Sequence, residues 1–201
     1  MKKTLPFFSY LFHPIFIPVF ATLFYFLFNE SYFNDQQKLL IVLQIVIITI
    51  FIPISFFFLL RSLGKIDNIM VSELSQRKFP LMIQAVLIVT LIQKSITLET
   101  IPELYFFFLG GLASTIMALI FLLCKIKVSL HMIGISTLTA FVIGLSFHTQ
   151  TNIIYTIAFL IFMNGVVASS RLAMKAHTNQ ELVLGFFVGM LPQVVLGYFW
   201  L

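Results

Sequence analysis

Long apolar runs alternate with short polar connectors along almost the whole chain. Seven runs can be distinguished, at about residues 11–28, 39–60, 80–92, 104–123, 132–147, 153–168 and 182–200. A helix needs roughly 20 apolar residues to cross the core of a bilayer, so most of these runs predict spanning helices, the second with a kink at Pro53. The third is short unless residues 91–96 extend it, and Pro14 and Pro18 interrupt the first. The pattern predicts an all-α, polytopic transmembrane helical bundle of six or seven membrane segments, folded as a single domain over residues 1–201.

Composition supports a membrane protein. The chain of 201 residues is 60% hydrophobic, contains 25 Phe and is only 9% charged, with a mean hydropathy of +1.08, far outside the soluble range. The net charge is +5, but the cations are spread among the connectors without the aromatic-interleaved basic patch typical of nucleic-acid binding. We therefore expect anionic lipid head groups as partners and no nucleic acid. The single cysteine, Cys124, excludes an intramolecular disulfide, and the sequence does not define an oligomeric state.

The polar connector from Ser169 to Glu181 carries the most chemistry. It places Ser170 and Arg171 before His177, and Glu181 follows the histidine by four residues. Arginine offers a planar fork of donors for phosphate oxygens, histidine serves as nucleophile or proton carrier near neutral pH, and a carboxylate can fix the tautomer of that histidine. This combination favours phosphoryl-transfer chemistry.

Two other polar connectors supply matching groups. Residues 61–78 include Arg77 and Lys78, in a stretch where residues 72–78 could form a short interfacial helix, and residues 125–131 include Ser129 and His131. Alternating spans would place the connectors after the second, fourth and sixth runs on one side of the membrane. We therefore expect these groups to converge.

At these residues the chain resembles the type 2 phosphatidic acid phosphatase superfamily. Ser170-Arg171, five residues, His177, three residues and Glu181 is similar to the third motif of that family, which ends in Asp. Val128-Ser129-Leu130-His131 is similar to the second motif, Pro-Ser-Gly-His. Ser72 to Pro80 is a loose counterpart of the first motif but lacks its Arg-Pro pair. The three occur in family order over about half the chain.

The resemblance implies a membrane lipid phosphatase that acts on a lipid phosphate monoester or a polyprenyl diphosphate. His177 would be the nucleophile that forms a phosphohistidine, Glu181 would hold its imidazole, and His131 would protonate the leaving oxygen. The phosphate-binding residues would be Arg171, Ser129, Ser170, Arg77 and Lys78, with Lys125 or Lys127 as further candidates. No metal or other cofactor is implied, and the sequence has no acidic cluster typical of a metal site.

The same residues could instead have structural roles. Thr178-x-x-Glu181 before an apolar run is also a capping box, Arg171 and Lys175 could be snorkelling anchors, and His131 could be a hydrogen-bonded interfacial residue. Arg77 and Lys78 could contact lipid head groups. A catalytically degenerate relative that binds anionic lipid or supports a membrane complex is the alternative function, favoured by Leu130 in place of Gly. A transporter has little support because no acidic residue lies in the middle of a run.

The two remaining histidines are interpreted as lying outside the site. His13, at the start of the first run, is predicted to be an interfacial or backbone-bonded residue, and His148 a solvated loop residue.

Two arguments about orientation conflict. If all seven runs span, the side of the membrane that carries the motifs also holds ten of the twelve cations, and the positive-inside rule makes it cytoplasmic. If the first run dips in and returns, six spans remain and the motifs face outward, as the resemblance implies. We favour the outward arrangement, which predicts a bacterial-type cytoplasmic membrane with a periplasmic active face.

Overall fold

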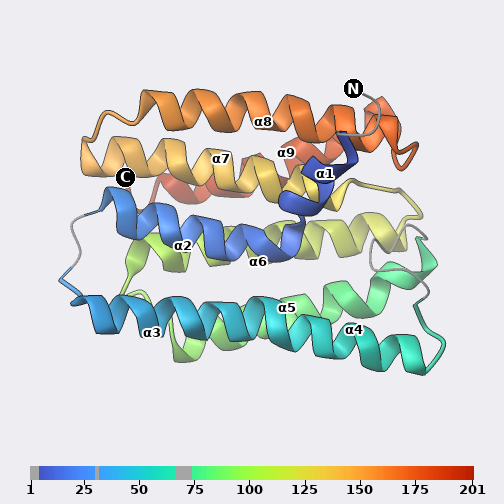
Figure 1. Ribbon diagram of the computed structural model, residues 1–201, viewed down its shortest axis with the longest axis horizontal. Helices are drawn as coiled ribbons and strands as arrows, with labels where there is room; N and C mark the ends of the chain where they lie inside the picture. The colour runs from blue at the N-terminus through green and yellow to red at the C-terminus, as the bar shows by residue number, and fades with distance from the viewer. Residues whose placement is uncertain (1–4, 30–31, 67–73) are drawn as a thin grey trace.

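The computed structural model describes residues 5–29, 32–66 and 74–201 (Figure 1). Every regular element in these ranges is helical, and six helical segments are long and apolar enough to cross a membrane. The prediction of an all-α polytopic bundle is confirmed. A seventh helix, α5 (Lys78–Lys94), has 17 residues and runs the length of the bundle beside the others (Figure 1). At 1.5 Å per residue it is about 25 Å long, close to the thickness of a bilayer core.

The first apolar run crosses the bundle. It consists of α1 (Leu5–Leu11), a 3₁₀ turn η1 (Pro14–Phe16) and α2 (Ile17–Phe28), which together form a candidate span of 24 residues. Both prolines stand in the first turn of their elements, where their missing N–H needs no partner. They redirect the chain between α1 and α2 without reversing it, so the run leads from one end of the bundle to the other (Figure 1). This path favours a span over the alternative of a run that dips in and returns.

The second run contains the predicted irregularity at Pro53. A capping box of Asn34 and Gln37 starts α3 (Asp35–Val46), and a π-helical turn η2 (Ile47–Phe51) leads into α4 (Ile52–Ser62). Pro53 cannot donate a hydrogen bond to the preceding turn, and a π turn is one way in which a helix accommodates that loss. Only 6% of the residues in the apolar window of this segment are buried inside the protein, so this segment is the one most open to the surrounding lipid among the six candidate spans.

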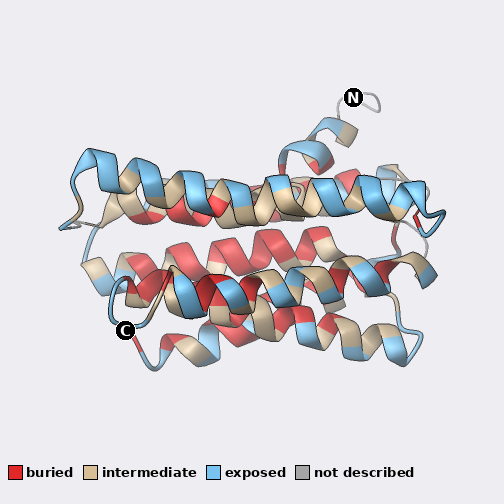
Figure 2. Cartoon of the chain, turned by 90° about the horizontal axis from the view of Figure 1, so that it is seen from below, coloured by how far each residue is buried: buried red, intermediate tan, exposed pale blue. Residues whose placement is uncertain are grey.

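The remaining helices pack around α7. They are α6 (Pro102–Leu123), α7 (Leu130–Thr149), α8 (Ile154–Ala173) and α9 (Asn179–Gly197). Buried residues occupy 61% of the apolar window of α7, and buried positions gather on the inward faces of the helices (Figure 2). In α9, Gly185 and Gly189 have the small-xxx-small spacing typical of close helix packing, and both lie close to α7. A Cβ atom at Gly185 would lie 2.7 Å from the carbonyl oxygen of Ser129, so only glycine allows this separation of α7 and α9.

The three polar connectors lie at one end of the bundle. The chain passes that end between α4 and α5, between α6 and α7, and between α8 and α9, and α1 lies there too (Figure 1). Ser72 and Glu73, which belong to the predicted interfacial helix, lie outside the described residues. Within the described part, Ser75–Arg77 form a short 3₁₀ turn, η3, that continues into α5. The expected convergence of the connectors is therefore present.

Candidate active site

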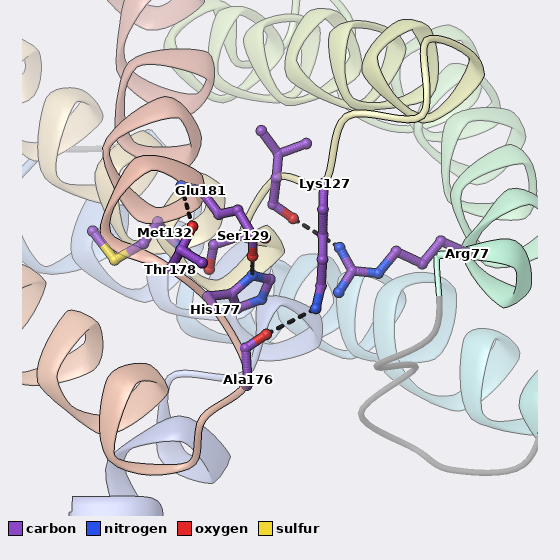
Figure 3. A network of polar contacts seen from close by, with 9 residues as sticks. Arg77, Lys127, Ser129, Met132, Ala176, His177, Thr178 and Glu181 are labelled. Atoms are coloured by element: carbon purple, nitrogen blue, oxygen red, sulfur yellow. Dashed lines mark hydrogen bonds and ion pairs between the residues drawn. The ribbon is translucent and has the colours of Figure 1, made fainter.

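His177 and Glu181 form a hydrogen-bonded pair between α8 and α9. The imidazole Nδ1 of His177 lies 2.6 Å from Oε2 of Glu181 (Figure 3). His177 lies directly before the N-cap residue Thr178, and Glu181 lies in the first turn of α9, so the two side chains are close at the start of this helix. Thr178 caps this helix by accepting a hydrogen bond from the backbone N–H of Glu181 at 3.4 Å. Only the Thr178 half of the predicted capping box is therefore present, and the carboxylate of Glu181 contacts the imidazole of His177.

The protonation state of His177 suits a nucleophile. Burial lowers the pKa of His177 from 6.5 to about 4, and the charges of Arg77, Arg171 and Lys127 act in the same direction, against the hydrogen bond with Glu181. The imidazole is therefore neutral near pH 7. Because a carboxylate only accepts, the single proton of the neutral ring resides on Nδ1. Nε2 then carries the lone pair available for attack.

Positive charge surrounds this imidazole. Arg77 is 5% exposed, and its Nη1 donates to the carbonyl oxygen of Val128 at 2.7 Å. Lys127 Nζ donates to the carbonyl oxygen of Ala176 at 2.9 Å (Figure 3). Burial lowers the pKa of Arg77, and the charge of Arg171, which is 2% exposed, lowers it further. Cations gathered in this way are stabilised by an anion placed among them.

A cavity of about 440 Å³ adjoins these groups. Its polar end is lined by His13, Arg77, His131, Arg171 and His177. Its other walls are mostly apolar, with Tyr10, Thr49 and Gln84 as polar exceptions. They come from α1, η1, η2, α4, α5 and the start of α2, with Leu130 at the start of α7. The arrangement can hold an anionic head group at one end and an apolar chain along the rest.

His131 is fixed by the first helix. Its Nε2 lies 3.0 Å from the backbone oxygen of Ser9 in α1. A carbonyl oxygen only accepts, so Nε2 of His131 carries a proton. Nδ1 is therefore the ring atom at which His131 can exchange a proton with another group.

The hydroxyl groups of the predicted site serve other contacts. Ser129 caps α7 by accepting from the backbone N–H of Met132 at 3.4 Å, and its own N–H donates to the backbone oxygen of Glu181 at 3.2 Å. Ser170 Oγ lies 2.6 Å from Ser9 Oγ. Lys78 is exposed at the start of α5. None of Ser129, Ser170 and Lys78 is among the residues that line the cavity, whereas Arg77, His131, Arg171 and His177 meet there.

Sequence reasoning missed His13 and misplaced His148. His13 is backbone-bonded, as predicted, but it also lines the cavity. Its ring contacts the ring of His131, which is 118 residues away in the sequence, so no local sequence pattern could have indicated this contact.

His148 is not a loop residue. It lies in the last turn of α7, with Nε2 3.1 Å from Oε1 of the buried Glu103, and its ring packs against Trp200. This pair lies at the other end of α7 from the candidate site.

Within the described ranges, no three His, Cys, Asp or Glu side chains are placed to hold a metal ion together. Comparisons of the chain with models of known protein families, with curated proteins and with solved structures gave no match. The resemblance to the phosphatase superfamily therefore rests on the residues of the three motifs alone.

Proposed function

We propose that this protein is a membrane lipid phosphatase that hydrolyses a lipid phosphate monoester or a polyprenyl diphosphate through a phosphohistidine intermediate. The observation that carries the proposal is the placement of a neutral, carboxylate-bonded His177 and two buried arginines at the polar end of an apolar cavity. Nucleophile, orienting carboxylate and anion-binding groups are the parts that cofactor-free phosphoryl transfer needs. The proposed partner is a membrane lipid, and no nucleic acid, metal or other cofactor is invoked.

The roles of the residues follow from their protonation. Nε2 of His177 attacks phosphorus, and the bond between phosphorus and the leaving oxygen breaks. His131, which takes up a proton on Nδ1 when the phosphate anion binds beside it, gives that proton to the leaving oxygen. In the second step, neutral His131 takes a proton from water as the water oxygen attacks the phosphohistidine. The P–N bond breaks, phosphate leaves, and both histidines return to their starting states. Arg77 and Arg171 offset the charge on the transferring phosphoryl group in both steps.

The cavity supports a lipid as the phosphate carrier. Its volume of about 440 Å³ lies within the range of roughly 300–1,000 Å³ that is common for ligand pockets. Part of the apolar wall comes from η2, α4 and α5, which also carry exposed large apolar side chains on the outside of the bundle. A lipid can therefore keep its tail against apolar side chains while its head group reaches His177.

One observation favours the alternative of a degenerate relative that binds anionic lipid without turnover. The hydroxyl of Ser129 is used as a helix cap, and Leu130 replaces the glycine of the resembled motif at the edge of the cavity. Such a protein would retain Arg77 and Arg171 as head-group ligands.

We further propose a bacterial-type cytoplasmic membrane as the location, with the active face on the cytoplasmic side. The outward arrangement depends on a first run that returns, whereas residues 5–28 form a candidate span of 24 residues. Lys127 hydrogen-bonds the backbone of Ala176 beside the site. Five other cations among the described residues at the active end do not line the cavity, so the site does not account for them: Arg61, Lys65, Lys78, Lys125 and Lys175. The opposite end has Lys38 and Lys94. This bias is the one that the positive-inside rule associates with the cytoplasm.

The deciding experiment is phosphate release by purified protein from a panel of lipid phosphates, with EDTA present. The panel contains phosphatidate, phosphatidylglycerophosphate and a polyprenyl diphosphate, and the His177→Ala variant is the control. Turnover by the wild type that is lost in the variant supports the phosphatase. Failure of a folded wild type across the panel, together with retained lipid binding, favours the degenerate relative.

A further inference from the structure

His13 belongs to the site although it lies in none of the three motifs. It stands between α1 and η1 and lines the cavity beside Arg171 and His177. Its ring lies edge-on to the ring of His131, with the centroids 5.1 Å apart and the planes at 87°. The site therefore contains three histidines, and only two of them have a role in the reaction described above.

The backbone fixes the tautomer of His13. Its Nδ1 accepts a hydrogen bond from the backbone N–H of Ile15 at 3.3 Å, which makes His13 the N-cap of η1. The next residue, Pro14, has no N–H, so Ile15 is the first residue of the turn that can donate. A nitrogen that accepts has no proton, and the neutral ring of His13 must carry its proton on Nε2.

The donor on Nε2 is available to a ligand. Within the described part of the chain, His13 Nε2 makes no hydrogen bond, whereas the corresponding proton of His131 is held by Ser9. Because the Nδ1 edge of the ring faces the backbone of Ile15, the Nε2 edge is the part left to face the cavity. A neutral N–H donor beside Arg171 can bind a phosphate oxygen without adding another charge to a crowded cationic site.

We propose that His13 is a phosphate-binding residue whose Nε2–H donates a hydrogen bond to an oxygen of the bound lipid phosphate. The proposal rests on the proposed function for the identity of the ligand, but it requires binding and not turnover. It also explains why the chain has a histidine at a cap position where Ser, Asp or Asn is the usual choice.

Two amide variants separate the donor from the cap. In His13→Asn the side-chain oxygen can replace Nδ1 as the cap, but no donor reaches the position of Nε2. In His13→Gln the longer amide can place an N–H near the position of Nε2, but the short-range cap is lost. Both are made in the His177→Ala background, which prevents turnover, and binding of dioctanoyl phosphatidate to the purified protein in detergent is measured.

We expect His13→Asn to weaken binding by about 10-fold to 150-fold, the range of a hydrogen bond to a charged group, and His13→Gln to bind within about threefold of the background. Thermal unfolding should show the opposite order, with His13→Gln the less stable protein. Dioctanoylglycerol, which lacks the phosphate, should bind equally to all three proteins.

Unchanged binding of phosphatidate by His13→Asn overturns the assignment. Equal weakening of phosphatidate binding in both variants also overturns it, and so does the absence of phosphatidate binding by the background protein. The phosphatase proposal fails separately, when the wild type releases no phosphate from the panel. If the wild type shows no turnover but the His13 variants show the expected binding pattern, His13 is a phosphate ligand in a protein that binds anionic lipid without hydrolysing it.

Discussion

Replacing Glu181 by Gln tests whether the carboxylate orients the nucleophile. In the wild type, Nδ1 of His177 donates to Oε2 of Glu181 at 2.6 Å, and the imidazole is buried. The amide of Gln can still accept from Nδ1 through its oxygen but carries no charge. A hydrogen bond to a charged group stabilises by about 1.5–3 kcal/mol, and each 1.36 kcal/mol corresponds to about a tenfold change in rate. We therefore expect kcat to fall by about 10-fold to 150-fold.

The assay is phosphate release from the best substrate of the panel at saturating concentration, with KM measured in parallel. Glu181 does not line the cavity, so KM should change little. The loss should be smaller than in His177→Ala, because the attacking atom remains.

Thr178→Ala is the matched control. Its hydroxyl caps α9 through the N–H of Glu181, so the variant should lose about 1 kcal/mol of stability and keep its kcat. A kcat within about twofold of wild type in Glu181→Gln would refute the orienting role and leave Glu181 as a residue of the helix start. An equal loss of kcat in Thr178→Ala would show that the position of α9, and not the charge, controls the rate.

Three further predictions address protonation, packing and topology. In protein labelled with ¹³C-histidine, the resonance that is missing from His177→Ala should stay in its neutral form as the pH falls and titrate near its lowered pKa of about 4; a midpoint near 6.5 would contradict the neutral nucleophile. Gly189→Ala should lower the free energy of unfolding by about 1–3 kcal/mol, because the new Cβ meets Ser136 Oγ and the carbonyl oxygen of Ile133, whereas Gly165→Ala, with no atom within 4 Å of its Cβ, should not. In a Cys124→Ser background in intact cells, an impermeant thiol reagent should reach a cysteine at Gln150 but not one at Lys65 or Lys175. The reverse pattern would put the active face outside, and labelling of only one of the latter two positions would contradict the topology.

The membrane fold could be predicted from the sequence because its signal is local. Runs of about 20 apolar residues define helices without reference to their neighbours, and alternation alone places the three polar connectors at one end. The close approach of α7 and α9 was also readable, since the small-residue spacing of Gly185 and Gly189 has one common physical use. The path of the first run could not be predicted from the sequence, because Pro14 and Pro18 fit both a helix start and a reversal of the chain.

The candidate site was predictable only where its residues are close in sequence. His177 and Glu181 are only four residues apart at the start of α9, so their contact needs no distant part of the chain. Whether the hydroxyls of Ser129 and Ser170 face a ligand depends on partners elsewhere in the chain, a helix N–H for the first and Ser9 for the second. The presence of His13 in the site likewise depends on how α1 packs against α7 and α8. Composition and periodicity do not predict that packing.

The weakly buried segment α3–α4 makes the surrounding bilayer a structural component of the cavity. This segment supplies one wall through η2 and α4, yet only 6% of the residues in its apolar window are buried inside the protein. Its outer surface is held by the neighbouring lipid tails, so their length and order help to set the distance between this wall and α5. Preference for tail length measured in detergent micelles will therefore differ from that in a native bilayer, and nanodiscs of defined thickness are the appropriate medium for comparing substrates.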